Sequence, residues 1–220
     1  MCGRMAITLP TEAMTQLFNA MPANNLPAVP NYNVCPTDKI HAIISDKNTR
    51  HIKAMRWGFL PNWYKSMTDG PLLINARSET IDKKPAFHDA CRHRRCLIPA
   101  DGFYEWAHKD DEKPIPYRVT RSDRQLMAMA GVWQNLEVDG QVVTSCAIVT
   151  TAANTKMQKI HNRLPVILDP ADWPLWLGEA GNGAAKLMQP VADSVLKLCR
   201  VTTAVNSNRA SGPELWAASK

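Results

Sequence analysis

The chain has 220 residues, of which 45% are hydrophobic and 21% charged, and its formal net charge is +6. This composition suits one globular domain, residues 1–220, with a sizeable core, and it excludes disordered and fibrous proteins. No segment approaches the roughly 18 consecutive apolar residues of a membrane span, and residues 1–10 hold no basic region followed by an apolar run. We therefore expect a cytoplasmic protein without a membrane partner, whose six cysteines are free thiols.

The first predicted element is a helix that begins at Thr11. Thr11 is a typical N-cap residue, and Met14, Leu17, Phe18 and Met21 follow at helical spacing, which predicts that they share a buried face. A shorter helix is predicted after the N-cap residue Asn154, and another near Asp172. Their inward-facing residues are expected to be Met157 and Ile160 in the first, and Trp173, Trp176 and Leu177 in the second.

Most of the remaining chain is strand-like. Four prolines within residues 21–36 predict an extended surface connection. The dipeptides Asp101-Gly102 and Asp139-Gly140 separate apolar runs and predict two tight hairpins. Strands are predicted at residues 40–44, 95–100, 103–107, 117–120, 126–133, 142–150, 164–168 and 196–205. Strands and helices do not alternate regularly, so we expect an α+β fold with a curved, barrel-like, mostly antiparallel sheet and peripheral helices.

Cys2 directly follows the initiator Met1, and its small side chain favours removal of that methionine. The mature chain would then carry an α-amine and a thiol on adjacent carbons, with pKa values of about 8 and about 8.5 in an unperturbed state. With an aldehyde, the amine forms an imine and the thiol closes a thiazolidine ring. The alternative is that Cys2 belongs to a frayed, inert terminus.

Three polar residues in other segments are candidates for a reactive site. Asn75 ends an apolar run and could orient a carbonyl or an amine, and Arg77 offers a fork for phosphate. In an extended strand Glu105 shares a face with Phe103, and a partly buried carboxylate there would suit proton transfer. His161 ends a predicted short helix and could shuttle protons. For each, an ordinary structural role is the alternative: a strand end, a solvated strand glutamate and a structural histidine.

Two further patterns are less specific. His88, Cys91, His93 and Cys96 invite a zinc reading, but zinc sites normally use two well-separated ligand pairs, and these gaps are only two, one and two residues. We therefore expect no metal. Trp57 and Trp63 lie in a stretch punctuated by glycine and proline; Trp57 is expected in the core, whereas Trp63 could stack on unpaired bases.

Taken in chain order, these segments resemble the SOS response-associated peptidase (SRAP) family over nearly the whole sequence. The resemblance is carried by MCGR, the YNV-x-P stretch at 32–36, RWGFLPNW, LINARSET, RRCLIPADGFYEW, the stretch at 150–154 and IHNRLPVIL. The family includes bacterial members and the eukaryotic sensor of abasic-site DNA. Position 35 is a cysteine where many members carry alanine, and Asn162 stands where aspartate is frequent.

The resemblance implies a covalent trap for abasic sites. In the family, the N-terminal cysteine captures the aldehyde of an abasic site in single-stranded DNA as a stable thiazolidine and so shields the lesion near stalled replication forks. When the family's roles are carried over to this sequence, Cys2 supplies the amine and the thiol, and Asn75 orients the N-terminus and the sugar. The resemblance further implies that Glu105 handles the amine proton and that His161 is the general acid/base at the sugar hydroxyl. No cofactor is implied.

The resemblance also implies which residues hold the DNA: Arg4, Arg77, Arg163, Trp63 and Thr150. The implied partner is single-stranded DNA with abasic sites, including 3′ ends and junctions at forks, bound by a monomer associated with the nucleoid. Two alternatives stay open. One is a thiol peptidase or autopeptidase that uses Cys2, which the family name records. The other is a non-covalent single-strand-binding module, whose affinity would fall steeply with salt.

Overall fold

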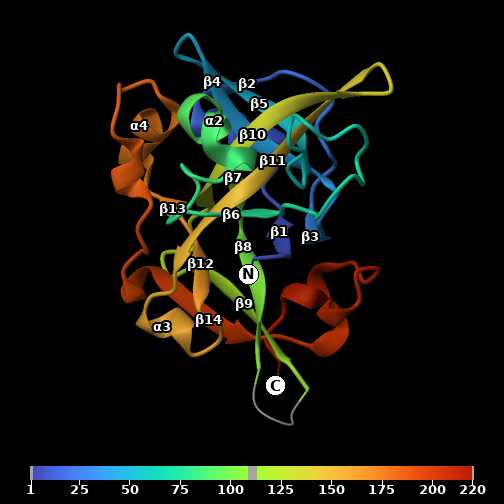
Figure 1. The fold of residues 1–220 in the computed structure, drawn as a ribbon. Coiled ribbons are helices and arrows are strands. Elements are labelled where there is room, and N and C mark those ends of the chain that lie inside the picture. The colour runs from blue at the N-terminus through green and yellow to red at the C-terminus, as the bar shows by residue number, and fades with distance from the viewer. Residues whose placement is uncertain (1, 109–112, 220) are drawn as a thin grey trace.

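The computed structural model describes residues 2–108 and 113–219, and its strands form two sheets. One sheet has the order β14-β9-β8-β1-β3. The other runs β12-β11-β10-β7-β4-β5-β2, with β13 pairing β10 and β6 pairing β11. Pairing is antiparallel except where β5 meets β2 and β11 and where β6 meets β11. The α+β, mostly antiparallel prediction is therefore confirmed (Figure 1).

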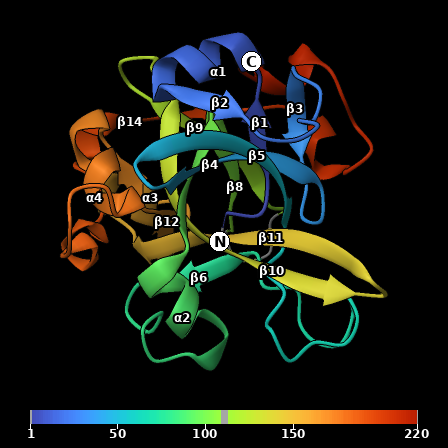
Figure 2. The same cartoon turned by 90° about the horizontal axis from the view of Figure 1, so that it is seen from above.

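The elements are short, apart from the long β10–β11 hairpin. The helices are α1 (Thr11–Phe18), α2 (Pro85–His93), α3 (Thr155–Gln158) and α4 (Trp173–Leu177). The strands are β1 (Met5–Ile7), β2 (Ala20–Pro22), β3 (Asn31–Val34), β4 (Lys39–Asp46), β5 (Thr49–Trp57), β6 (Asn75–Arg77), β7 (Arg95–Ala100), β8 (Gly102–Ala107), β9 (Ile115–Arg121), β10 (Met127–Val138), β11 (Gln141–Ala152), β12 (Arg163–Pro165), β13 (Ile167–Leu168) and β14 (Leu196–Arg200). In Figure 2 the strands curve around a shared interior, with α1, α2 and α4 outside them.

The predicted hairpin at Asp101-Gly102 is wrong. β7 pairs with β4 and β10, whereas β8 pairs with β1 and β9, so the chain passes from one sheet to the other at this dipeptide. Asp101 is tied to the N-terminal segment, since its backbone N–H bonds to Ala6 and its carboxylate accepts from Thr8. A Cβ at Gly102 would lie 2.2 Å from the Val119 carbonyl, so glycine permits the close approach of β9.

The other strand predictions hold with adjusted ends, except that the strand predicted at 164–168 is two strands, β12 paired with β11 and β13 paired with β10. Asp139-Gly140 does turn β10 into β11, both residues having positive φ. The predicted strand at 196–205 ends at Arg200, and a 3₁₀ turn over Thr203–Asn206 follows. The connection at 21–36 contains part of β2 and all of β3.

The predicted α1 face is partly wrong. Met14 and Phe18 are buried, but Leu17 is 46% exposed and Met21, which lies in β2, is 56% exposed. Thr11 is the first helical residue, not a cap that accepts a side-chain hydrogen bond. α3 and α4 match their predictions: Asn154 accepts from the Met157 N–H, and the inward-facing residues of α4 are buried. α2 was not predicted.

One large core cluster lies between the sheets and reaches under α1, α2 and α4. The six cysteines are free thiols, three of them buried. Among the residues that the structure describes, no helix has the length and apolarity to cross a membrane.

Candidate functional site

The N-terminal segment is held against β8, and this brings Cys2 to Glu105. Met5 pairs with Phe103, and the Tyr104 N–H donates to the Arg4 carbonyl over 2.9 Å. Cys2 is therefore 2% exposed rather than frayed. Burial raises the pKa of its thiol well above the ordinary value, and the charge of Glu105 raises it further. The thiol is neutral at physiological pH.

Glu105 is buried on β8, 5% exposed, on the same strand face as Phe103. The alternative of a solvated strand glutamate is therefore wrong. Its charge acts on both the Cys2 thiol and the His161 imidazole. One buried carboxylate is thus coupled to two groups that can exchange protons.

Asn75 holds the other side of Cys2. It begins β6, which pairs in parallel with β11 and places Asn75 opposite Ile148. Its Nδ2 donates to the Cys2 carbonyl over 2.9 Å. Its Oδ1 is buried and has no hydrogen-bond partner among the described residues. This oxygen is an acceptor available to a bound hydroxyl or amine.

His161 lies in the turn between α3 and β12. Its backbone N–H caps the end of α3 through the Met157 carbonyl. Its ring Nδ1 accepts from the Arg163 N–H over 2.9 Å, so the neutral ring carries its proton on Nε2. Burial lowers the pKa of His161, and the nearby Glu105 charge opposes this decrease. A neutral imidazole with an Nε2 proton can donate to a substrate oxygen.

The structure gives Arg163 a partner that the sequence did not suggest. Its Nη1 and Nη2 bond to the two oxygens of Glu79 over 2.6 and 2.9 Å, and Nη2 also donates to the Thr150 carbonyl over 2.7 Å. Thr150 itself is buried in β11. Glu79 is 84 positions from Arg163 in sequence, and its place four residues after Asn75 gave no signal of this pairing.

The remaining residues expected to contact DNA lie in different settings. Arg77 is exposed on β6, opposite Thr150. Arg4 donates from Nη1 to Asn33 and to the Val205 carbonyl, and its guanidinium lies 5.9 Å from the Trp106 ring centre. Trp63 is 54% exposed, whereas Trp57 is fully buried, as expected.

The model of one protein family, SOS response associated peptidase (SRAP), matches residues 1–208. The chain belongs to this family. It is 34% identical over 222 residues to the abasic site processing protein YoqW of Bacillus subtilis, covering 98% of each chain. It is 31% identical to YedK of Escherichia coli, covering 83% of this chain and 82% of that protein.

A more distant relative of this SRAP chain is the abasic site processing protein HMCES of Xenopus tropicalis, 28% identical with 99% of this chain and 78% of that protein covered. The SRAP fold is also seen in a crystal structure of a protein from Bacteroides thetaiotaomicron, with a TM-score of 0.88, 21% identity and full coverage of both chains. The resemblance inferred from the sequence motifs is thereby confirmed.

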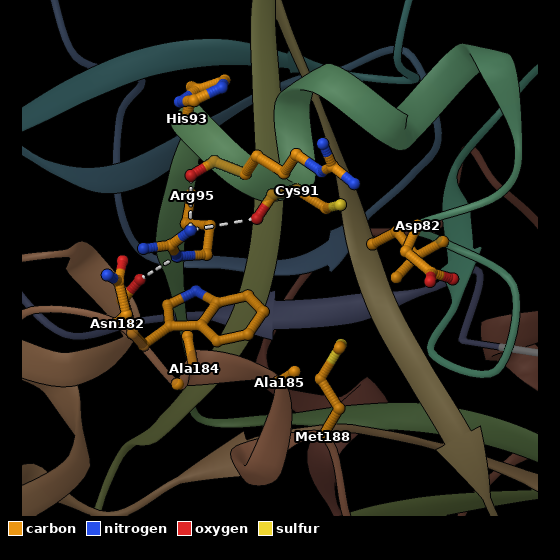
Figure 3. Close-up of a pocket in the computed structure, with 12 residues that line it drawn as sticks. Asp82, Cys91, His93, Arg95, Asn182, Ala184, Ala185 and Met188 are labelled. Carbon is orange, nitrogen blue, oxygen red and sulfur yellow. Dashed lines mark hydrogen bonds between the residues drawn. The ribbon is translucent and has the colours of Figure 1, made fainter.

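Several cavities lie elsewhere on the SRAP chain. One of about 420 Å³ lies between α2 and residues 182–188 and is lined by Asp82, Cys91 and Arg95 (Figure 3). Cys2, Asn75, Glu105 and His161 do not line this cavity or four others on the described surface, which lie near Arg118, Val142, Leu126 and Tyr64 respectively. The described residues include no cluster fit to hold a metal, and Cys96 is buried in β7, so the zinc reading has no support.

Proposed function

We propose that this protein captures the aldehyde of abasic sites in single-stranded DNA as a thiazolidine on Cys2, once Met1 has been removed. The observation that carries the proposal is the 2.9 Å hydrogen bond from Asn75 to the Cys2 carbonyl, and the charge of buried Glu105 also acts on the Cys2 thiol. The names of the curated relatives, which call them abasic site processing proteins, support the choice of substrate. We extend the proposal to 3′ ends and junctions at forks, bound by a monomer.

Thiazolidine formation from the amine, the thiol and the aldehyde releases one water molecule overall. The Cys2 amine adds to the C1′ aldehyde of the ring-opened sugar, and the carbinolamine loses water to give an imine. The thiol sulfur then adds to the imine carbon, while the thiol proton ends on the ring nitrogen. His161 donates from Nε2 to the sugar oxygen as the sugar opens, and Glu105 relays protons between amine and thiol. The Oδ1 of Asn75, which has no hydrogen-bond partner among the described residues, accepts from the sugar or the amine.

In the chain that still carries Met1, the pKa of the Cys2 thiol argues against its acting as a peptidase nucleophile. A nucleophilic peptidase cysteine needs a depressed pKa, because the thiolate is the attacking species. Burial and Glu105 shift the pKa of Cys2 in the opposite direction. In the proposed order the α-amine, which is present once Met1 has been removed, reacts first, and ring closure follows within a covalently held imine.

The test is a denaturing gel of the protein mixed with a single-stranded oligonucleotide that carries one abasic site. We expect a shifted band that survives salt and denaturant, that Cys2→Ala abolishes and that Cys35→Ala, which removes another thiol near the surface, retains. Intact mass spectrometry should show loss of Met1. An unshifted oligonucleotide with verified Met1 removal would refute the covalent proposal, and salt-sensitive retention on a native gel alone would favour the non-covalent module.

A further inference from the structure

Glu79 forms an ion pair with Arg163, so the Arg163 guanidinium beside the proposed reaction site is already bound by a carboxylate. Both pairs of atoms are within hydrogen-bond distance, 2.6 and 2.9 Å, in the two-bond fork that an arginine also offers to phosphate. The Arg163 hydrogen bond lowers the pKa of Glu79, so the carboxylate is charged at neutral pH. The carboxylate therefore carries the charge that the pair requires at neutral pH.

The remaining contacts of Arg163 fix the guanidinium in place. Nη2 also bonds to the Thr150 carbonyl, and the backbone N–H bonds to the His161 ring. The Arg163 side chain is only 14% exposed, whereas that of Glu79 is 49% exposed. An anion that arrives from solvent thus meets the position that Glu79 already fills.

The positive charge available near β11 depends on whether Glu79 is bound to Arg163. Arg77 and Arg163 lie on strands that flank β11 on its two sides, opposite Thr150 and Ala152 respectively. Arg77 is exposed and makes no ion pair with another described residue, so it is ready to bind a phosphate. Arg163 is neutralised by Glu79, so of these two arginines only Arg77 has no ion-pair partner among the described residues.

We propose that Glu79 is a specificity-determining residue that competes with DNA phosphates for Arg163. The inference rests on the proposed DNA-binding function. An undamaged strand must displace the Glu79 carboxylate to gain the Arg163 contact, and the resulting low affinity leaves retention to the covalent step at an aldehyde. Undamaged single strands, which vastly outnumber lesions, are thus released.

The test measures binding without chemistry, in a Cys2→Ala background with a lesion-free single-stranded oligonucleotide, by fluorescence anisotropy over a range of salt concentrations. Glu79→Gln should bind the oligonucleotide about threefold to tenfold more tightly at low salt. The slope of log K against log salt concentration should become steeper by about 0.7, which is the contribution of one more phosphate contact on a single strand. The matched control is Glu12→Gln, which removes the same charge from an exposed position in α1. It should change both quantities far less.

Two further variants separate competition from structural support. Glu79→Asp keeps the charge and should keep the affinity low. On an Arg163→Gln background, Glu79→Gln should give no gain beyond that of Glu12→Gln, because no guanidinium is released; this variant also keeps the test available should an unpaired Arg163 impair folding. An affinity in Glu79→Gln equal to or below that of the Glu12→Gln control would overturn the proposal. Because no lesion is used, this failure would leave covalent capture untouched.

Discussion

The Asn75 side chain is bonded to the Cys2 carbonyl through Nδ2, while its Oδ1 is buried without a partner among the described residues. One amide thus holds the backbone of Cys2 and presents an acceptor beside it. Because the two functions lie on different atoms, a substitution can remove both or only one.

We expect Asn75→Ala to slow cross-linking roughly tenfold or more, since a lost bond to a buried group costs about 1–3 kcal/mol. The measurement is the single-turnover rate of band formation on denaturing gels. Asn135→Ala is the matched control, because its amide bonds to Thr144 in the distant β10–β11 hairpin. Equal rates for the two variants would contradict the positioning role.

Buried His41 should make the fold sensitive to acid. It is 1% exposed, neither ring nitrogen has a partner among the described residues, and burial lowers its pKa to about 4 from 6.5. The unfolded chain therefore binds a proton between these values that the fold excludes, so the free energy of unfolding decreases as pH falls from 6.5 towards 4. The loss approaches about 3 kcal/mol.

Urea unfolding at pH 7.5 and pH 5 measures this dependence. His41→Leu should flatten it, whereas His88→Gln, at an exposed position of α2, should leave it unchanged. A His41→Leu protein that loses as much stability as the parent between these pH values would assign the effect to other groups.

Arg95 should be important for stability rather than for capture. Its guanidinium bonds to carbonyls at the ends of two helices: Arg92 of α2, Trp176 of α4, and Cys91 of α2, which is labelled with Arg95 in Figure 3. Such carbonyls have no partner within their own helices. Arg95→Met should cost roughly 2–3 kcal/mol, measured by urea unfolding, with normal cross-linking by the folded fraction. Exposed Arg92→Met should change stability by less than about 0.5 kcal/mol.

Trp63 should contribute to binding rather than to folding. The Trp63 side chain is 54% exposed, so Trp63→Ala should change the free energy of unfolding by less than about 0.5 kcal/mol. If it stacks on a base, non-covalent affinity for a single strand should fall by about 1–3 kcal/mol, read by anisotropy in a Cys2→Ala background. Val142→Ala, at an exposed apolar residue in β11, is the control. Unchanged affinity would remove Trp63 from the DNA surface.

The fold could be predicted where a local pattern decides the structure. The apolar run of residues 95–100 matches β7 residue for residue, and the turn at Asp139 pairs strands adjacent in sequence. β6 could not be predicted, because its three residues are extended only through pairing with β11, more than 70 positions later. The hairpin prediction at Asp101-Gly102 was wrong because the same dipeptide suits both a hairpin and a change of sheet.

The sequence singled out Asn75, Glu105 and His161 as candidates, but it did not give their environment. Alternation placed Glu105 beside Phe103, yet its burial depends on β1 pairing with β8, which brings the N-terminal segment against that strand. The Glu79–Arg163 pair joins segments whose distance in sequence carries no periodic signal. Sequence patterns thus identify the polar residues, and tertiary pairing sets their charge and exposure.

β11 is bonded to four other strands, β10, β12, β5 and β6. Asn75 and the strand that follows His161 are attached to its far half, near Ile148 and Ala152. Local opening in this region would break several ladders together, so the amide protons of Ile148, Val149 and Thr150 should exchange with solvent only when the whole molecule unfolds. Asn75 and the segment that follows His161 therefore hold their relative positions for as long as the protein stays folded, and a site built on them would be formed before any ligand binds.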